Sequence, residues 1–184
     1  KPKVSLVVQD DYSKLIASYP ASTRCAKEVQ LQVERFLGPG TKALHAYSDN
    51  APEFLKAMQE MGIVHDTSTP YRSETNGVAE RAVRRVKEGT SACLVQSGLN
   101  EVFWDLATEC YCMLRNFVDT LINGDTAWER KFGTPFQGPI IPFGAELLYK
   151  PSAPEDVKRT HKFGNKLLHG IFVGYVLHAG GGWT

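Results

Sequence analysis

Short β-branched runs alternate with amphipathic segments of helical period through the first two thirds of the chain. Residues 3–9 (KVSLVVQ) and 14–20 (KLIASYP) flank the polar tetrapeptide DDYS, which predicts a β-hairpin. Residues 22–38 then place apolar side chains at spacings of three and four, and a Gly-Pro-Gly stop follows, as expected of a helix. This order of elements predicts an α/β fold, with strands in a sheet and helices against it.

The alternation continues toward the middle of the chain. KALHAY (42–47) and IVH (63–65) are predicted strands, and PEFLKAMQEMG (52–62) between them is a predicted helix with Pro in its first turn and Gly at its end. Two further helices are predicted at residues 78–89 and 101–121. The second contains Cys110 and Cys112, which we interpret as small core residues.

The composition changes near Gly124, where glycine, proline and aromatic residues become frequent. The stretches TAWERKFGTPFQGPIIPFGAELLYKP and HGIFVGYVLHAGGGW predict short strands joined by turns in a small all-β unit. We therefore predict two domains, residues 1–123 and 124–184, with the boundary between residues 124 and 134.

Bulk properties restrict the class of protein. The chain is 42% hydrophobic and 22% charged with a net charge of +1, so any nucleic-acid binding must use a local basic patch. Its four cysteines form no CxxC pair, which argues against a structural zinc site. Without a signal peptide or a long apolar span, the sequence predicts an intracellular protein with reduced thiols and no membrane partner.

Two acids occupy positions where α/β folds place reactive groups. Asp49 follows a predicted strand, and Glu80 lies in the first turn of the helix after a polar loop. Each also has a structural interpretation. Asp-Asn is a favoured turn pair, and Glu80 suits the positive end of a helix and can pair with Arg84.

The residues around Glu80 favour a functional interpretation. On a helix, Glu80, Arg84 and Lys87 fall on nearly the same face, next to a loop that offers Arg72 and Asn76. An acid for a hard divalent cation, beside cations for phosphates, suits phosphodiester chemistry. The alternative is a solvated helix face formed by Arg81, Arg84, Arg85 and Lys87.

These motifs resemble a known family. YSDNAPEF followed by MGIVHDTSTPYRSETNGVAERAVRRVKE is similar to the catalytic core of retroelement integrases, particularly the copia type. VVQDDYSKLIASYP resembles the family's second strand and its turn. The segment after residue 124 resembles the small β-barrel that follows the copia-type core, so the resemblance covers nearly the whole chain.

The resemblance implies an RNase H-like fold, a mixed sheet flanked by helices, and metal-dependent polynucleotidyl transfer. In such enzymes three carboxylates hold two Mg²⁺ (or Mn²⁺) ions, which act on the attacking and leaving oxygens. By resemblance, Asp49 and Glu80 are the second and third catalytic, metal-binding acids. The reactions implied are 3′-end processing of element DNA and its strand transfer into target DNA.

The same resemblance implies partners. Arg84 and Lys87 match positions that would contact the DNA end, with Arg81, Asn76 and Arg72 as further DNA-binding candidates. Element and target DNA are the expected partners, with self-association and no small-molecule substrate. A nucleus or a nucleoprotein particle is the implied location.

The sequence departs from the family pattern in several places. The family's first acid lies on a strand upstream of the segment matched by KVSLVVQ, so we expect a core that lacks its first strand, followed by an incomplete barrel. Asp10 and Asp11 are candidate substitutes for that acid, although a turn role is the alternative. Thirty residues lie between Asp49 and Glu80, fewer than usual, and Ala51 replaces the glycine of Asp-Asn-Gly. By the same comparison, we expect a core without the zinc-binding segment that precedes it in the family.

These departures leave alternatives open and lead to one structural expectation. The first strand lies centrally in the family's sheet, so we expect either a gap in the sheet or an unusual pairing of residues 3–9. The leading hypothesis is that the chain is a fragment of a copia-type integrase whose parent protein joins element DNA to target DNA. The main alternative is a catalytically inactive remnant that binds nucleic acid or oligomerises. Another RNase H-like nuclease fits less well, because the segment after the core matches the copia arrangement.

Overall fold

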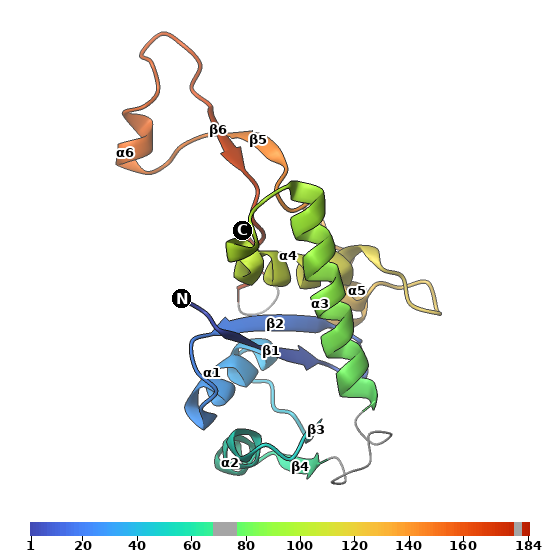
Figure 1. The fold of residues 1–184 in the computed structure, drawn as a ribbon. Coiled ribbons are helices and arrows are strands. Elements are labelled where there is room, and N and C mark those ends of the chain that lie inside the picture. Colours follow the sequence, from blue (N-terminus) through green and yellow to red (C-terminus); the bar gives the residue numbers. More distant parts are fainter. Residues whose placement is uncertain (68–76, 179–181) are drawn as a thin grey trace.

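The structure is a computed structural model that describes residues 1–67, 77–178 and 182–184. Its elements are β1 (Val4–Gln9), β2 (Ile16–Ala21), α1 (Ala26–Leu37), β3 (His45–Ser48), α2 (Pro52–Met61), β4 (Val64–Thr67), α3 (Gly77–Ser97), the 3₁₀ turn η2 (Glu101–Phe103), α4 (Trp104–Val118), α5 (Ala127–Phe132), β5 (Glu146–Tyr149), α6 (Pro154–Val157) and β6 (Leu168–Ile171). Figure 1 shows α4 above the β1–β2 hairpin and α1 and α2 below it. Helices therefore lie on both sides of the hairpin, as the alternation in the sequence predicts.

The predicted hairpin at the start of the chain is confirmed. β1 and β2 pair antiparallel, from Val4 opposite Ala21 to Gln9 opposite Ile16. β3 and β4 pair parallel, and α2 forms the connection between them. Parallel pairing requires such a crossover, because the chain must return to the same end of the sheet.

Of the two outcomes expected for the sheet, the structure shows the gap. Within the described residues the strands form three two-stranded sheets, β1–β2, β3–β4 and β5–β6, and no hydrogen bonds join β1 to β3. Leu6 of β1 and Ala46 of β3 nevertheless pack against the same cluster, formed by Val29, Ala57 and Met58 of α1 and α2. One core thus connects two sheets that do not share a hydrogen-bond ladder.

Seven of the fifteen residues of helix α4 are buried. Cys110 and Cys112 are 1% and 2% exposed, which confirms that they are core residues. Burial raises the pKa of both thiols to about 12, so they are protonated and unreactive at neutral pH. Cys112 packs with Ile16 of β2 and with two small apolar residues of α3, Ala82 and Val86.

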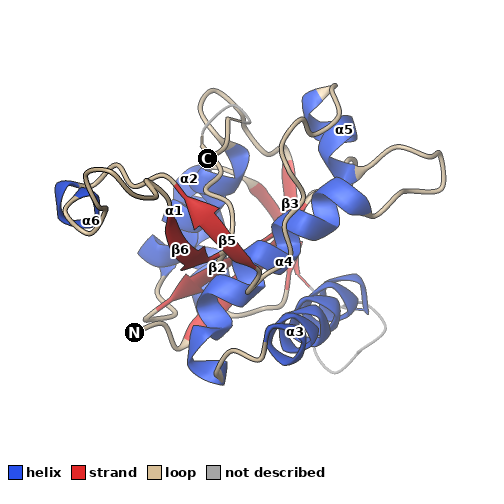
Figure 2. Ribbon diagram, turned by 90° about the horizontal axis from the view of Figure 1, so that it is seen from above, coloured by secondary structure: helices blue, strands red, loops and turns tan. Residues whose placement is uncertain are grey.

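Asn116 of α4 ties this helix to the hairpin. Its side chain is 2% exposed, accepts a hydrogen bond from the Ile16 amide (3.0 Å) and donates one to the Ile16 carbonyl (2.8 Å). Seen from above, α4 runs over β2 (Figure 2). The side chain of Asn116 thereby takes the place of a neighbouring strand for one residue of β2.

Helix α3 is longer than predicted, ending at Ser97 rather than at Gly89. Gly89 lies where α3 crosses α4, and a Cβ atom there would come within 2.0–2.4 Å of the Tyr111 ring. Glycine is therefore needed inside this helix for close approach rather than to end it.

We expect Gly89→Ala to destabilise the fold by about 1–3 kcal/mol, because the Tyr111 ring must move out of a packed position. Alanine is the better helix former by roughly 1 kcal/mol, so in a Tyr111→Leu background the same change should be neutral or stabilising. Urea unfolding of the four proteins of this double-mutant cycle tests the contact. Equal effects of Gly89→Ala in both backgrounds would contradict it.

The segment after residue 124 differs from the predicted all-β unit. It contains the helices α5 and α6, and its described strands form a single hairpin, β5–β6, rather than a barrel. Helix α5 begins with a capping box, in which Thr126 and Glu129 each satisfy the other's backbone amide. The barrel-like segment is thus not confirmed.

An aromatic cluster joins this segment to α4. Phe117 of α4 stacks on Phe136 with a centroid distance of 3.6 Å and meets Trp128 and Tyr175 edge to face. Trp183 also packs against the cluster. The division into domains 1–123 and 124–184 stays a prediction, but the residues on its two sides share this core.

Candidate functional site

Asp49 lies directly after β3, at the carboxyl end of the strand, and its side chain is exposed. One of its carboxylate oxygens accepts a long hydrogen bond from the Ala51 amide, 3.4 Å, and α2 begins one residue later at Pro52. The acid is therefore at the end of its strand, as predicted, with most of its hydrogen-bonding capacity free for a ligand.

A hydrogen-bonded chain fixes the backbone of Asp49. The Ser48 hydroxyl donates to the Asp49 carbonyl (2.7 Å) and lies 2.9 Å from Nε2 of His65 on β4. Because the single hydroxyl proton is used on Asp49, the Ser48 oxygen must accept, and His65 must donate from Nε2. No sequence motif indicated Ser48 and His65, because only the parallel pairing of β3 with β4 brings these two residues together.

Glu80 lies in the first turn of α3 and is exposed, as are Arg84 and Lys87 further along the helix. Among the described residues no ion pair joins Glu80 to Arg84, so the predicted structural pairing is not formed. Ala82 and Val86 of the same helix are buried in the core.

The face of α3 that packs against the fold is narrow. Val78 and Val83 are 62% and 37% exposed, since the helix contacts the hairpin and α4 along a narrow stripe. Arg81 is exposed and folds back toward the start of the helix, where its Nη1 atom lies 3.5 Å from the position that a Cβ on Gly77 would occupy. Two other predicted DNA-binding residues, Arg72 and Asn76, lie outside the described residues.

The described residues do not by themselves make a complete metal site. No group of three or more His, Cys, Asp or Glu side chains in residues 1–67, 77–178 and 182–184 is close enough to hold a metal ion. Asp49 and Glu80 are oxygen donors of the kind that Mg²⁺ prefers, but a site for two ions needs more ligands than two exposed acids supply.

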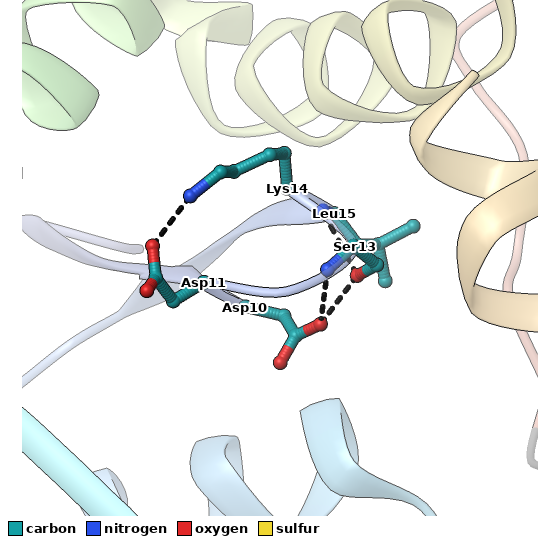
Figure 3. Close-up of polar contacts among 5 residues, drawn as sticks. All are labelled: Asp10, Asp11, Ser13, Lys14 and Leu15. Atoms are coloured by element: carbon teal, nitrogen blue, oxygen red, sulfur yellow. Dashed lines mark hydrogen bonds and ion pairs between the residues drawn. The ribbon is translucent and has the colours of Figure 1, made fainter. Parts of the chain in front are cut away.

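Asp10 and Asp11, the candidate substitutes for a third acid, lie in the β1–β2 turn (Figure 3). The Asp10 carboxylate accepts hydrogen bonds from the amide and the hydroxyl of Ser13, and Asp11 pairs with Lys14. Burial raises the pKa of Asp10, but the Ser13 hydrogen bonds and the charges of Lys131 and Lys14 outweigh it and lower the pKa. Both acids thus take part in turn contacts, and their role as metal ligands stays a prediction.

One further finding concerns the membrane. None of the helices in the described part of the chain is long and apolar enough to cross a bilayer.

Solved structures define the class of fold. The chain is similar to the catalytic core domain of BIV integrase, with 26% identity and a TM-score of 0.51 over 67% of this chain and 81% of that one. It is also similar to the HTLV-2 integrase catalytic core domain in complex with magnesium (23% identity, TM-score 0.53, 68% and 82% covered). A simian T-cell lymphotropic virus intasome structure matches 95% of this chain and 63% of that one at 20% identity and a TM-score of 0.57. The fold is therefore mixed α/β, like that of the RNase H-like integrase cores.

Proteins of similar sequence indicate more closely which kind of integrase core the chain resembles. The chain is 30% identical over 136 residues to the retrovirus-related Pol polyprotein from transposon RE1 of Arabidopsis thaliana, and 28% identical over 135 residues to that from transposon RE2. Each match covers 71% of this chain but only 9% of the polyprotein. No protein-family model matches the chain. Together these similarities support an integrase catalytic core from a retrotransposon, as the motifs predicted.

Proposed function

We propose that the chain is the core region of a copia-type integrase whose parent protein processes the 3′ ends of element DNA and joins them to target DNA. The observation that carries this proposal is the placement of Asp49 and Glu80. One follows a strand and the other begins a helix, both exposed, in a chain that resembles integrase cores. The match to transposon Pol polyproteins supports it independently.

We propose that Asp49 and Glu80 are two of the acids that hold Mg²⁺ or Mn²⁺ in the parent protein. The magnesium complex of the HTLV-2 core supports the choice of metal. The described residues lack a third ligand, so a further acid is needed before the site can act. Asp10 and Asp11 remain candidates, although their side chains already take part in turn contacts.

We assign DNA contacts to the exposed cations of α3, Arg84 and Lys87, with Arg81 near the start of the helix and Arg72 and Asn76 as candidates outside the described residues. The two cations lie four and seven residues after Glu80, so phosphates bound to them would pass close to the acid. Self-association is supported by the dimeric and trimeric HTLV-2 cores, and a nucleoprotein complex by the intasome.

A second function has one observation in its favour. Because the described residues hold no group of three metal-ligating side chains, a catalytically inactive module that binds nucleic acid or oligomerises also fits. Strand transfer by the parent protein with element-end DNA and Mg²⁺ or Mn²⁺ separates the two. Joined product supports the integrase, and DNA binding without product supports the inactive module.

The DNA-binding assignment has its own test. We expect Arg84→Ala and Lys87→Ala each to weaken binding to duplexes of unrelated sequence by a similar factor and to make the salt dependence shallower by about 0.9 per lost phosphate contact. Lys27→Ala, at an exposed cation of α1, is the matched control. A salt slope that stays at the value of the unmodified protein in both α3 variants would show that these cations are only a solvated helix face.

A further inference from the structure

The β5–β6 hairpin and the residues between its strands form an arm that reaches away from the helices α3 and α4. Figure 2 shows α6 at the outer end of this arm, and in Figure 1 the loop that follows α6 reaches furthest from α3 and α4. Residues 150–169 contain five lysines and arginines but only two acids, whereas the whole chain has 21 against 20. Positive charge is thus concentrated in a segment that contains none of the proposed metal-binding or DNA-binding residues.

One aromatic side chain stands out in the arm. Phe163 is 86% exposed, so a large apolar ring is held in water without a packing partner in the core. The backbone around it is ordered by local hydrogen bonds. The Phe163 amide donates to Nδ1 of His161 (3.2 Å), the Gly164 amide donates to the His161 carbonyl (3.3 Å), and the Leu167 amide donates to the Asn165 side chain (2.9 Å).

One cation and one further ring lie against this aromatic side chain. The Lys162 ammonium lies 5.5 Å from the Phe163 ring centroid, and the His161 ring is 6.4 Å away, centroid to centroid. The Lys166 ammonium donates to the carbonyls of His161 and Lys162 (2.6 and 2.7 Å), which closes the turn of residues 161–166. Arg159 pairs with Asp156 at 3.0 Å, so Lys158, Lys162 and Lys166 carry the remaining positive charge of the loop.

We propose that this basic loop, residues 158–166, binds single-stranded nucleic acid, with a base stacked on Phe163 and the adjacent phosphates on Lys162 and its neighbours. An exposed ring with a lysine beside it, in a loop of net positive charge, has the two features that such binding needs, since every base has a face for stacking and every phosphate a charge. A duplex offers no free base face along its length, so unpaired strands are preferred. A role of this loop in DNA integration rests on the proposed function. The binding of single-stranded nucleic acid by the loop does not depend on it.

The test is fluorescence anisotropy with an oligothymidylate of about 20 nucleotides and a duplex of equal length, at several salt concentrations. We expect Phe163→Ala to weaken single-strand binding about tenfold with the salt slope unchanged, because stacking is not ionic. Phe163→Trp should retain the affinity. Lys162→Ala should make the slope shallower by about 0.7.

Tyr12→Ala is the matched control, because Tyr12 is 74% exposed and has Arg130 4.7 Å from its ring, but lies in the β1–β2 turn. Four results would each overturn the proposal. The affinity of Phe163→Ala for the single strand could be unchanged, or Tyr12→Ala could lose as much of that affinity. Phe163→Ala could lose as much affinity for the duplex, or the unmodified protein could fail to bind the single strand. The proposed function is tested by two separate measurements, strand transfer by the parent protein and the salt dependence of duplex binding by Arg84→Ala. A negative result for the loop is therefore distinguishable from a failure of the proposed function.

Discussion

Strand transfer by the parent protein is expected to fall on the order of 1,000-fold or more, about 4 kcal/mol of transition-state stabilisation, in Asp49→Asn and in Glu80→Gln. Each change keeps the shape of the side chain but removes the charge with which the acid would attract a divalent cation. Because both side chains are exposed and neither is part of the core, the fold should stay intact. Product formation with Mg²⁺ and with Mn²⁺, measured beside thermal unfolding, separates lost activity from lost structure.

Two other acids provide matched controls. Asp66→Asn changes an exposed acid of β4 that contacts His45 at 2.9 Å, and Glu88→Gln changes an exposed acid two turns along α3 from Glu80. Neither of these two substitutions should lower the rate of strand transfer more than a few fold. Activity that survives both Asp49→Asn and Glu80→Gln would show that these acids are turn and helix-end residues after all.

Asn116→Ala is expected to destabilise the fold by about 3–4 kcal/mol. The substitution leaves the buried amide and carbonyl of Ile16 without partners, and each lost partner costs roughly 1–3 kcal/mol. Ile16 is fully buried, so water cannot replace the side chain without opening the packing between β2 and α4. Urea unfolding followed by circular dichroism gives the change in the free energy of unfolding.

A second substitution at the same site tests the mechanism. Asn116→Asp keeps an acceptor for the Ile16 amide but loses the donor to its carbonyl, so it should destabilise the fold at neutral pH. It should recover part of the loss in acid, when the protonated carboxyl can donate again. Asn123→Ala, at an exposed loop residue beyond α4, should change stability by less than about 0.5 kcal/mol. A loss below about 1 kcal/mol in Asn116→Ala would show that the Ile16 groups find other partners.

The elements that periodicity predicted best are those whose signals are local. The β1–β2 hairpin, α1 and α2 follow from apolar spacing, turn residues and helix stops within a few residues of each element. The all-β prediction for the last segment failed because glycine, proline and aromatic residues are typical of short strands, but here the aromatic rings fill a cluster against α4. A local signal for α5 was nonetheless present, since Thr126 and Glu129 have the spacing of a capping box.

In the first two thirds of the chain the sequence by itself determined which segments are strands and helices. It also placed Asp49 and Glu80 at the ends of such elements, because these features depend on residues close together in the chain. Only the tertiary structure decided that Asn116 completes the hydrogen bonding of Ile16, that His65 donates to Ser48, and that β1 and β3 share a core without pairing. A buried donor or acceptor takes whichever partner the fold brings to it, and for Ile16 that partner is 100 residues away. The pattern of apolar residues records no such distance.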